Sequence, residues 1–407
     1  MLRDAFFHPE PPAVELRAFT HGLQPRTVPA MMQAFADDWR ACGVDAWNAV
    51  PDRWQSGRNT GWWNLPEVLG DAFLAPLLGV PEGTAIHLPS VHAAVAGVLA
   101  SPEVWQHGHR LVTTAGEFPS VLHTSQRMQR LLGIDVDMVP QTPDGYANVD
   151  GLIEAIRRHG TALVAFSHVG FSTGERLLNA TIREIVREAH AAGALVLVDG
   201  YHATGSLVIG AEALGVDLYT GGLLKEACGS AGNAYLYIRD GLDLTPATTG
   251  WFGGGDPFAF GLAPDVHPDV RRRFLGGTTS VASLYHAVEG VRVLLDAGLD
   301  RVEAHVAALS ARAVARAQDA GLRLVTPDDP ARRGALLVME MDGADEMVAY
   351  LKTRHVFADG RRGRLLRIAP FVWNDADDVD RCFDVLTDAL RTGAHRGHRE
   401  TTHGPVT

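Results

Sequence analysis

Between residues 84 and 240, short apolar runs alternate with longer segments in which apolar residues recur at helical spacing. The runs predict strands at residues 85–88, 110–114, 135–139, 162–167, 195–199, 218–221 and 234–238. Helices fit between them, for example at residues 120–132, 149–158 and 179–192. Strands that alternate with helices are typical of a parallel sheet with helices on both faces. We therefore expect an α/β domain with a mainly parallel seven-stranded sheet, which binds ligands at the carboxyl ends of its strands.

The flanking segments predict an N-terminal arm and a second, smaller domain. Residues 1–30 form an irregular, proline-containing arm, the patterns at 28–41 and 65–78 predict helices, and the tryptophan-rich segment 45–64 carries loops. A loop and a long helix at 274–297 lead out of the large domain, which spans 31–290. The small α+β domain, 291–392, has predicted strands near 334–341 and 365–369 and helices near 300–320, 344–353 and 375–391. The polar tail, 393–407, is predicted to be disordered.

Composition and charge narrow the class of protein. A chain of 407 residues is long for one core, so two domains are expected. The formal net charge of −12 disfavours nucleic acid as a main partner. Three widely spaced cysteines form neither a disulfide framework nor a metal motif, which favours a reducing cytoplasm. No cleavable leader or apolar run of about 18 residues is present, so we expect no membrane span.

The stretch from residue 195 to 238 contains the strongest candidate chemistry. Asp199 ends one predicted strand, and Lys225 precedes another in a glycine-rich segment. A pyridoxal 5'-phosphate (PLP) enzyme needs a lysine amine that binds the cofactor and an acid that holds its pyridine nitrogen protonated. Lys225 is one of only two lysines in an arginine-rich chain, so its retention favours chemistry that arginine cannot perform. The alternatives are a surface lysine in a turn and an aspartate that caps a helix.

Four further positions fit a cofactor or substrate site. His202 follows Asp199 closely and is expected near the cofactor ring, or else is an ordinary core histidine. Phe118 begins a helix and can stack on a flat ring or simply pack in the core. The helix that starts at Ser90 and Val91 offers free N–H groups to a phosphate, although Ser90 equally fits a plain helix cap. Arg367 lies in an apolar run and suits either a carboxylate clamp or a structural ion pair.

These residues lie in motifs that resemble those of the kynureninase group. This group belongs to the class V aminotransferase family, whose members are PLP enzymes of fold type I. The similarity covers residues 19–370. The matching segments are FTHGLQP at 19–25, FPS at 118–120, FSHVGFSTG at 166–174, DGYHATG at 199–205, GGLLKEACGSAG at 221–232, GWFG at 250–253 and LRIAP at 366–370.

The resemblance implies a role for several residues. Lys225 would bind PLP, with Phe118 stacked on its ring and Ser120 and Ser167 as further contacts. Trp251 would reach the cofactor phosphate across the interface of a homodimer. The remaining implied contacts are Asp199, His202, Ser90 and Val91 to the cofactor, and Thr20 and Arg367 to the substrate.

Three positions depart from the kynureninase pattern. Leu224 replaces the tyrosine before the lysine, Val121 replaces an aspartate, and Thr278, in GGTTS, replaces an asparagine. A threonine at that place resembles cysteine desulfurases, where it meets the phosphate of the neighbouring subunit.

The resemblance implies a substrate that forms an external aldimine and loses its Cα proton, with kynureninase-like hydrolytic C–C cleavage as the favoured outcome. A β-elimination lyase or desulfurase, an aminotransferase and an epimerase remain alternatives, and a non-catalytic PLP-fold subunit is a distant one. Trp47, Trp54, Trp62 and Trp63 fit either a pocket for a bulky substrate or core packing.

Overall fold

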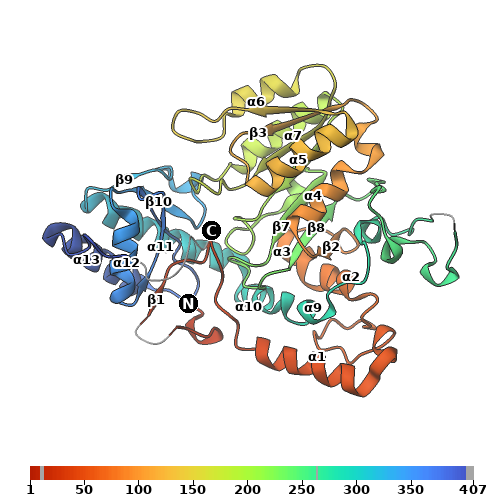
Figure 1. Cartoon of the computed structure of the whole chain (residues 1–407), viewed down its shortest axis with the longest axis horizontal. Coiled ribbons are helices and arrows are strands. Elements are labelled where there is room, and N and C mark those ends of the chain that lie inside the picture. The colour runs from red at the N-terminus through yellow and green to blue at the C-terminus, as the bar shows by residue number, and fades with distance from the viewer. Residues whose placement is uncertain (10–12, 263–264, 400–407) are drawn as a thin grey trace.

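A computed structural model describes residues 1–9, 13–262 and 265–399. The chain forms a large lobe around a central sheet and a smaller lobe from the C-terminal third (Figure 1). In the described residues, no helix is both long and apolar enough to span a membrane.

The central sheet has seven strands in the order β2-β8-β7-β6-β5-β3-β4. Neighbouring strands pair in parallel except at β8, which is antiparallel to both β2 and β7. This confirms the predicted mainly parallel seven-stranded α/β fold. The strands are β2 (Ala85–Leu88), β3 (Arg110–Thr114), β4 (Asp135–Val139), β5 (Thr161–Ser167), β6 (Leu195–Asp199), β7 (Leu218–Gly222) and β8 (Ala234–Ile238).

Successive residues of the central strands face two separate cores. Val164 and Val196 lie in the core on one face of the sheet. Their chain neighbours Leu163 and Leu197 lie in the core on the other face. Strands covered on both faces must be apolar throughout, which explains their short continuous apolar runs.

Helices of the large lobe connect these strands. The connecting helices include α4 (Val91–Leu99), α5 (Pro119–Leu132), α6 (Val149–Ile156) and α7 (Asn179–Ala191), while α1 (Val28–Cys42) precedes the first strand of the sheet. Two predicted helices are present, but neither is one regular α-helix.

The predicted helix at 65–78 is divided into α2 (Leu65–Leu69), a π-helical turn (Gly70–Leu74) and α3 (Ala75–Leu78). At this turn the backbone of Gly70 packs so closely that a Cβ would lie 2.2 Å from the carbonyl oxygen of Ala85. The long helix predicted to end at residue 297 is divided at Val288 into α9 (Val281–Ala287) and α10 (Glu289–Ala297). Gly290, after the break, packs equally closely, since a Cβ there would lie 2.1 Å from the carbonyl oxygen of Ala227.

The smaller lobe contains a four-stranded antiparallel sheet and three helices. Its sheet order is β12 (Asp359–Arg361), β13 (Leu365–Ile368), β10 (Leu337–Glu340) and β9 (Arg323–Leu324). Helices α11 (Leu299–Asp319), α12 (Ala344–Thr353) and α13 (Ala376–Thr392) pack around it. The predicted domain limits remain a prediction. Of the tail predicted to be disordered, residues 400–407 lie outside the described residues.

The N-terminal arm was predicted to be irregular, but part of it forms a strand. Its strand β1 (Val14–Glu15) pairs in parallel with β11 (Val356–Phe357) of the smaller lobe. From there the arm runs to α1, at the lower edge of the large lobe (Figure 1). Backbone pairing ties the arm to the C-terminal third because two exposed strand edges satisfy each other.

Two of the tryptophans in segment 45–64 belong to the core. Trp54 is 1% exposed, and Trp62 donates its indole N–H to the hydroxyl of Tyr285 at 3.0 Å. The core-packing alternative therefore holds for Trp54 and Trp62.

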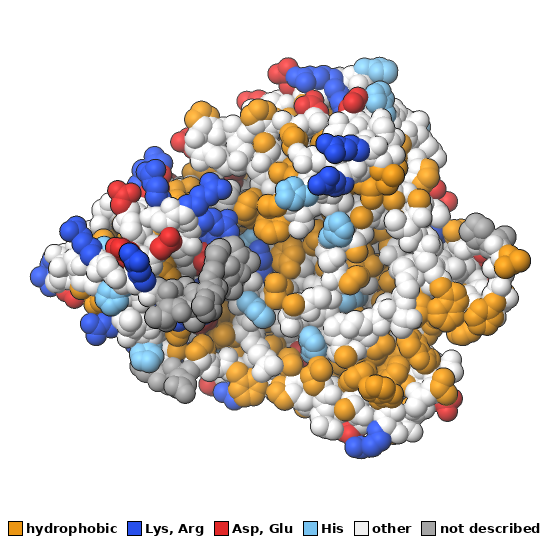
Figure 2. All heavy atoms as spheres, in the orientation of Figure 1, with side chains coloured by type: hydrophobic (Ala, Val, Ile, Leu, Met, Phe, Trp, Pro, Cys, Tyr) orange, Lys and Arg blue, Asp and Glu red, His pale blue; other side chains and the backbone are white. Residues whose placement is uncertain are grey.

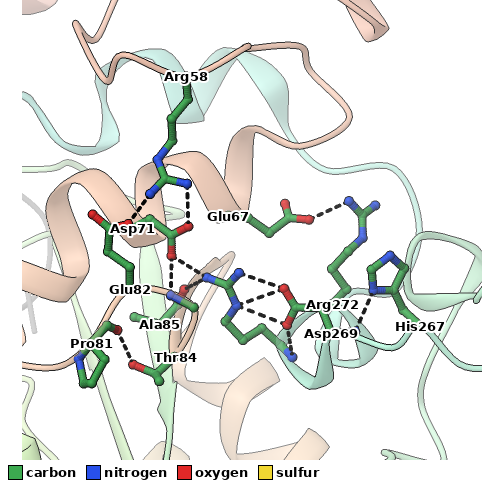
Figure 3. A network of polar contacts seen from close by, with 12 residues as sticks. Arg58, Glu67, Asp71, Pro81, Glu82, Thr84, Ala85, His267, Asp269 and Arg272 are labelled. Carbon is green, nitrogen blue, oxygen red and sulfur yellow. Dashed lines mark hydrogen bonds and ion pairs between the residues drawn. The ribbon is translucent and has the colours of Figure 1, made fainter. Parts of the chain in front are cut away.

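Buried arginines tie the segment after GWFG to the region around α2 (Figure 3). Arg271 bonds to Asp71 at 2.7 Å and to both oxygens of Asp269, and Arg272 bonds to Glu67 at 2.5 Å. Their side chains are 8% and 5% exposed, so these pairs are shielded from solvent. The network fixes the position of the loop that carries Trp251.

Candidate active site

The carboxyl ends of the parallel strands bring five predicted residues to one edge of the sheet. Ser167 ends β5 and lies opposite Asp199, which ends β6. Lys225 and His202 meet there from two further loops, at 2.8 Å between Nζ and Nε2. Phe118 follows β3 and faces the same amine, with Nζ 5.8 Å from its ring centre. Distant sequence positions thus converge where ligands of this fold class bind.

The Lys225 amine lies among aromatic rings and is largely removed from solvent. Its Nζ is 4.8 Å from the ring centre of Tyr201, in addition to its contacts with His202 and Phe118. Burial lowers the pKa of Lys225 to about 8, against opposing effects of the Glu226 and Asp199 charges. A lysine with a lowered pKa carries more neutral amine at neutral pH, which is the nucleophilic form.

Asp199 is a buried acid beside this amine. It is 8% exposed, and its Oδ1 accepts a hydrogen bond from the backbone N–H of Tyr201 at 2.9 Å. Burial raises the pKa of Asp199 to about 6. A cationic ring nitrogen placed against it would favour the carboxylate, so the site fits a protonated pyridine.

Glu117 is a second buried acid that the sequence reasoning missed. It accepts hydrogen bonds from the hydroxyl of Thr114 at 2.6 Å and the backbone N–H of Ser167 at 3.1 Å, and its other oxygen bonds to the Ser167 hydroxyl. Burial raises the pKa of Glu117 to about 7, with the nearby Asp199 adding to the shift. The one feature of the sequence that could have indicated Glu117 is its position in GEFPS, directly before Phe118. Glu117 orients Ser167, the residue paired with Asp199 across the sheet.

The segment that carries Lys225 is closely packed against the N-terminal arm. The Gly22 N–H donates to the carbonyl of Leu224 at 3.0 Å. A Cβ on Gly22 would lie 2.2 Å from the Lys225 carbonyl oxygen and 2.5 Å from Cys228 Sγ. Only glycine permits this approach, so the matched segment FTHGLQP positions the lysine loop from outside the sheet.

Ser90, Val91 and Ser120, at the N-termini of α4 and α5, make ordinary structural contacts. Ser90 caps α4, because its hydroxyl accepts the N–H of Ala93 at 3.1 Å, and Val91 is buried in the core. Ser120 lies in the first turn of α5, where its carbonyl accepts the hydroxyl of Thr124 at 2.6 Å. The N-terminus of α4 follows β2 at the carboxyl edge, as a phosphate site requires, and this role remains a prediction.

A cavity of about 1700 Å³ opens beside this cluster. Its lining comes from the arm, the lysine loop, the helix start at Phe118 and the smaller lobe, and includes Thr20, Phe118, Phe171, Cys228, Asp359 and Arg361. Arg367 lies next to its wall and is 2% exposed, with its guanidinium 4.8 Å from the Phe19 ring centre and bonded to Asp359. The hydroxyl of Thr20 is buried and has no hydrogen-bond partner within residues 1–9, 13–262 and 265–399. The two predicted substrate contacts thus flank one cavity.

Two predicted cofactor contacts do not join the cluster within this chain. Trp251 is 45% exposed, donates its indole N–H to the carbonyl of Pro257 at 2.8 Å and stacks on Phe260. Thr278 is exposed. Hydrophobic side chains gather on the surface over the protruding segment that carries Trp251 (Figure 2).

The residues around Lys225 fit PLP. They supply an amine, an aromatic face, a buried acid and a histidine, which are the groups that this cofactor needs. In the described residues, no group of three or more His, Cys, Asp or Glu side chains is placed to hold a metal ion.

Comparisons with known proteins identify the family. The aminotransferase class-V profile matches residues 89–357. A kynureninase of Xanthomonas axonopodis pv. citri is 28% identical over 91% of this chain and 90% of its own. An uncharacterized aminotransferase of Bacillus subtilis, YcbU, is 27% identical over 77% of this chain and 80% of its own.

Solved structures share the fold. The apo cysteine desulfurase of Thermococcus onnurineus superposes with a TM-score of 0.78 at 18% identity, covering 93% of this chain and 95% of its own. A complex of the cystine C–S lyase C-DES with cysteine persulfide gives a TM-score of 0.77 at 18% identity, covering 93% and 98%. The chain therefore belongs to the class V aminotransferase family, as a kynureninase-like, PLP-dependent enzyme.

Proposed function

We propose that this enzyme acts on an amino acid and cleaves a C–C bond of its side chain by hydrolysis, as a kynureninase does. The observation that carries the proposal is the amine of Lys225, with its lowered pKa, between His202, Phe118 and Tyr201. Similarity to kynureninase over 91% of the chain supports this choice of reaction.

PLP, when bound, draws electrons away from the substrate Cα and so acidifies its proton. Lys225 then removes that proton, because its pKa of about 8 lets it act as a base near neutral pH. Asp199 holds the ring nitrogen protonated from a buried position that water does not screen. Phe118 covers the ring, and Ser90, Val91, Ser120 and Ser167 are the proposed further contacts to the cofactor.

The substrate is held from the cavity side. Arg367 takes the α-carboxylate, since a guanidinium fork matches a carboxylate in geometry and charge. Thr20 supplies a hydroxyl whose oxygen has no other partner among the described residues. A cavity of about 1700 Å³ has room for a bulky side chain, which supports a substrate of kynurenine size.

The second candidate is a β-elimination lyase of desulfurase type. Three departures from the kynureninase pattern weaken kynurenine as the substrate, and Thr278 resembles the threonine of cysteine desulfurases. Leu224 is apolar where kynureninases carry a tyrosine, Val121 is 3% exposed in the core where they carry an aspartate, and Thr278 is exposed in the loop before α9. An aminotransferase or epimerase would need the same amine, acid and carboxylate clamp. A non-catalytic subunit would have no need to keep a lysine amine desolvated beside Asp199.

We also propose that the enzyme works as a homodimer in the cytoplasm. Trp251, Phe258, Phe260 and Leu262 are 45%, 60%, 73% and 104% exposed and form an apolar patch that favours contact with another protein surface. A second copy would cover this patch and bring Trp251 and Thr278 towards the cofactor phosphate of its partner. Free cysteines at positions 42, 228 and 382 support a reducing compartment.

One experiment separates the candidates. The purified enzyme, loaded with PLP, is incubated separately with L-kynurenine, L-cysteine and L-alanine, and the products are identified by mass spectrometry. Release of alanine from kynurenine supports the hydrolase, and release of sulfide from cysteine supports the lyase. Conversion of bound PLP to its amine form favours an aminotransferase. Lys225→Ala is the control, and turnover by this variant would contradict the assignment of the base.

A further inference from the structure

Glu226 is a buried carboxyl that the proposed reaction does not use. Its side chain is fully buried, and neither oxygen accepts a hydrogen bond from any other residue that the structure describes. Burying a carboxyl without partners costs free energy, so such groups in folded proteins call for a specific explanation. Glu226 directly follows Lys225 in the chain, which suggests that its role concerns the lysine.

His202 links the two residues in space. Its Nε2 lies 2.8 Å from Lys225 Nζ. Its Nδ1 has no hydrogen-bond partner in the described part of the chain and lies 4.0 Å from Glu226 Oε1. A movement of about 1 Å turns the second contact into a hydrogen bond. Lys225, His202 and Glu226 thus form a buried row in which the imidazole separates an amine from a carboxyl.

The charges around the row favour exchange of a proton between its ends. Burial raises the pKa of Glu226 and lowers that of Lys225, so two groups with very different ordinary pKa values are brought closer together. Burial and the Lys225 charge lower the pKa of His202 well below its usual value, which keeps the imidazole neutral. The other groups that act on the row are Asp199, Tyr201, Cys228, Arg361 and Arg367.

We propose that Glu226 is a positioning residue that stores a proton for Lys225 and exchanges it through His202. In one state Lys225 is an ammonium and Glu226 a carboxylate. An N–H bond of Nζ then breaks as one forms at His202 Nε2, and the Nδ1–H bond breaks as an O–H bond forms at Glu226. The row keeps its total charge, so the lysine changes protonation without losing a proton to solvent.

This inference rests on the proposed function, because only a lysine that alternates between base and acid needs such a store. It also predicts a property of the chain without cofactor. The Glu226 charge holds the pKa of Lys225 up against burial, so removing that charge must lower it further.

The test measures how the reactivity of Lys225 depends on pH in the full-length, PLP-free chain. Reductive methylation with formaldehyde and cyanoborohydride is followed by mass spectrometry of the Lys225 peptide, with the exposed Lys352 as the internal reference. The midpoint is the pH at which methylation of Lys225 reaches half its maximal rate. We expect this midpoint to fall by about one pH unit in Glu226→Gln. Glu226→Asp, which keeps the charge, should stay near the wild-type midpoint. Glu226→Met, an uncharged side chain of similar volume, should reproduce the shift if the glutamine variant folds poorly.

Glu117→Gln is the matched control, because Glu117 is an equally buried carboxyl that is not among the main charges acting on Lys225. A wild-type midpoint in both Glu226→Gln and Glu226→Met would overturn the proposal, as would an equal shift in Glu117→Gln. The result is separable from the proposed function. If PLP labels Lys225 but the midpoint does not move, only the proton store is wrong. If PLP does not label Lys225, the proposed function fails whatever the midpoint does.

Discussion

Arg367, which is buried, forms an ion pair with the partly exposed Asp359 beside the proposed substrate cavity. The Arg367 Nε donates to Asp359 Oδ2 at 2.6 Å, and the terminal Nη2 bonds to the same oxygen. The two residues are opposite one another on the paired strands β13 and β12, so the sheet register fixes the contact. A guanidinium has five N–H donors, and the donors that Asp359 does not use remain for a carboxylate of the substrate. The pair therefore orients the proposed clamp and leaves it able to bind.

Replacing Arg367 should weaken substrate binding more than cofactor binding. We expect Arg367→Gln to raise KM by about tenfold or more, because truncating one partner of a buried charge pair costs 2 kcal/mol or more. The visible absorbance of bound PLP should persist. Steady-state kinetics on the turned-over amino acid check the first point, and the absorption spectrum checks the second.

Arg364→Gln is the matched control, since Arg364 is 74% exposed and pairs only loosely with Asp342, at 3.8 Å. An unchanged KM in Arg367→Gln would show that another group binds the carboxylate.

Glu117 should make the stability of the PLP-free chain depend on pH. Its pKa is raised to about 7 in the folded chain, against about 4.3 when unfolded, so the folded state keeps a proton that the unfolded state releases between these values. Stability from this group is therefore present at low pH and is lost as pH rises towards 7. Glu117→Gln removes the titration. Relative to wild type, the variant should gain on the order of 2 kcal/mol between pH 5 and pH 8.

Thermal or urea unfolding at both pH values measures this difference. Comparison with a variant cancels the opposing effect of buried histidines such as His87 and His168, whose pKa values burial lowers to about 4 and about 3. A difference in stability that does not change with pH would mean that Glu117 ionises normally.

Gly22 should be needed for the correct placement of the lysine loop. An added methyl group would collide with backbone at Lys225, so Gly22→Ala should lose about 1–3 kcal/mol of stability and bind PLP more weakly. Differential scanning calorimetry and PLP titration test this. Gly277→Ala serves as the control, because no atom of the described residues lies within 4 Å of a Cβ at that position. Equal behaviour of the two variants would show that the arm does not position the lysine.

The apolar patch around Trp251 should hold two subunits together. We expect the wild-type chain to elute from size exclusion with about twice its mass of 43.8 kDa, and Phe260→Asp to shift it towards the monomer and weaken PLP binding. Val44→Asp is the control, because Val44 is 79% exposed outside this patch. Light scattering gives the masses, and a dimeric Phe260→Asp protein with full PLP affinity would rule out this interface.

The central strands of the large sheet were predictable because burial on both faces demands continuous apolar runs, whereas the edge strand β4 (Asp135–Val139) is partly exposed and alternates polar with apolar residues. Asp199 and Lys225 were predictable as a pair because strand ends in such a sheet converge on one edge. The π-helical turn that begins at Gly70 and the break at Val288 were not predictable. Each lies at or near a close contact with distant backbone, at Ala85 and Ala227, and the helical pattern of the sequence carries no sign of these contacts.

Burial of acids was equally hidden in the sequence. Glu117 and Glu226 look like any surface glutamate when written as letters, and only the fold shows them enclosed beside Asp199 and Lys225. The sequence alone left open whether Arg367 is a carboxylate clamp or part of a structural ion pair. Its pairing with Asp359 could not be predicted, because it depends on the register of two strands. Pairing and desolvation are tertiary effects, whereas periodicity and spacing are local ones.

The most direct test of the account is the site of PLP attachment. The purified chain is saturated with PLP, reduced with borohydride and digested, and the peptides that carry Lys225 and Lys352 are compared by mass spectrometry. Because these are the only two lysines, each outcome is unambiguous. The account predicts a yellow protein that borohydride bleaches, with one pyridoxyl group on Lys225 and none on Lys352. A colourless protein, or a pyridoxyl group found only on Lys352, would contradict it.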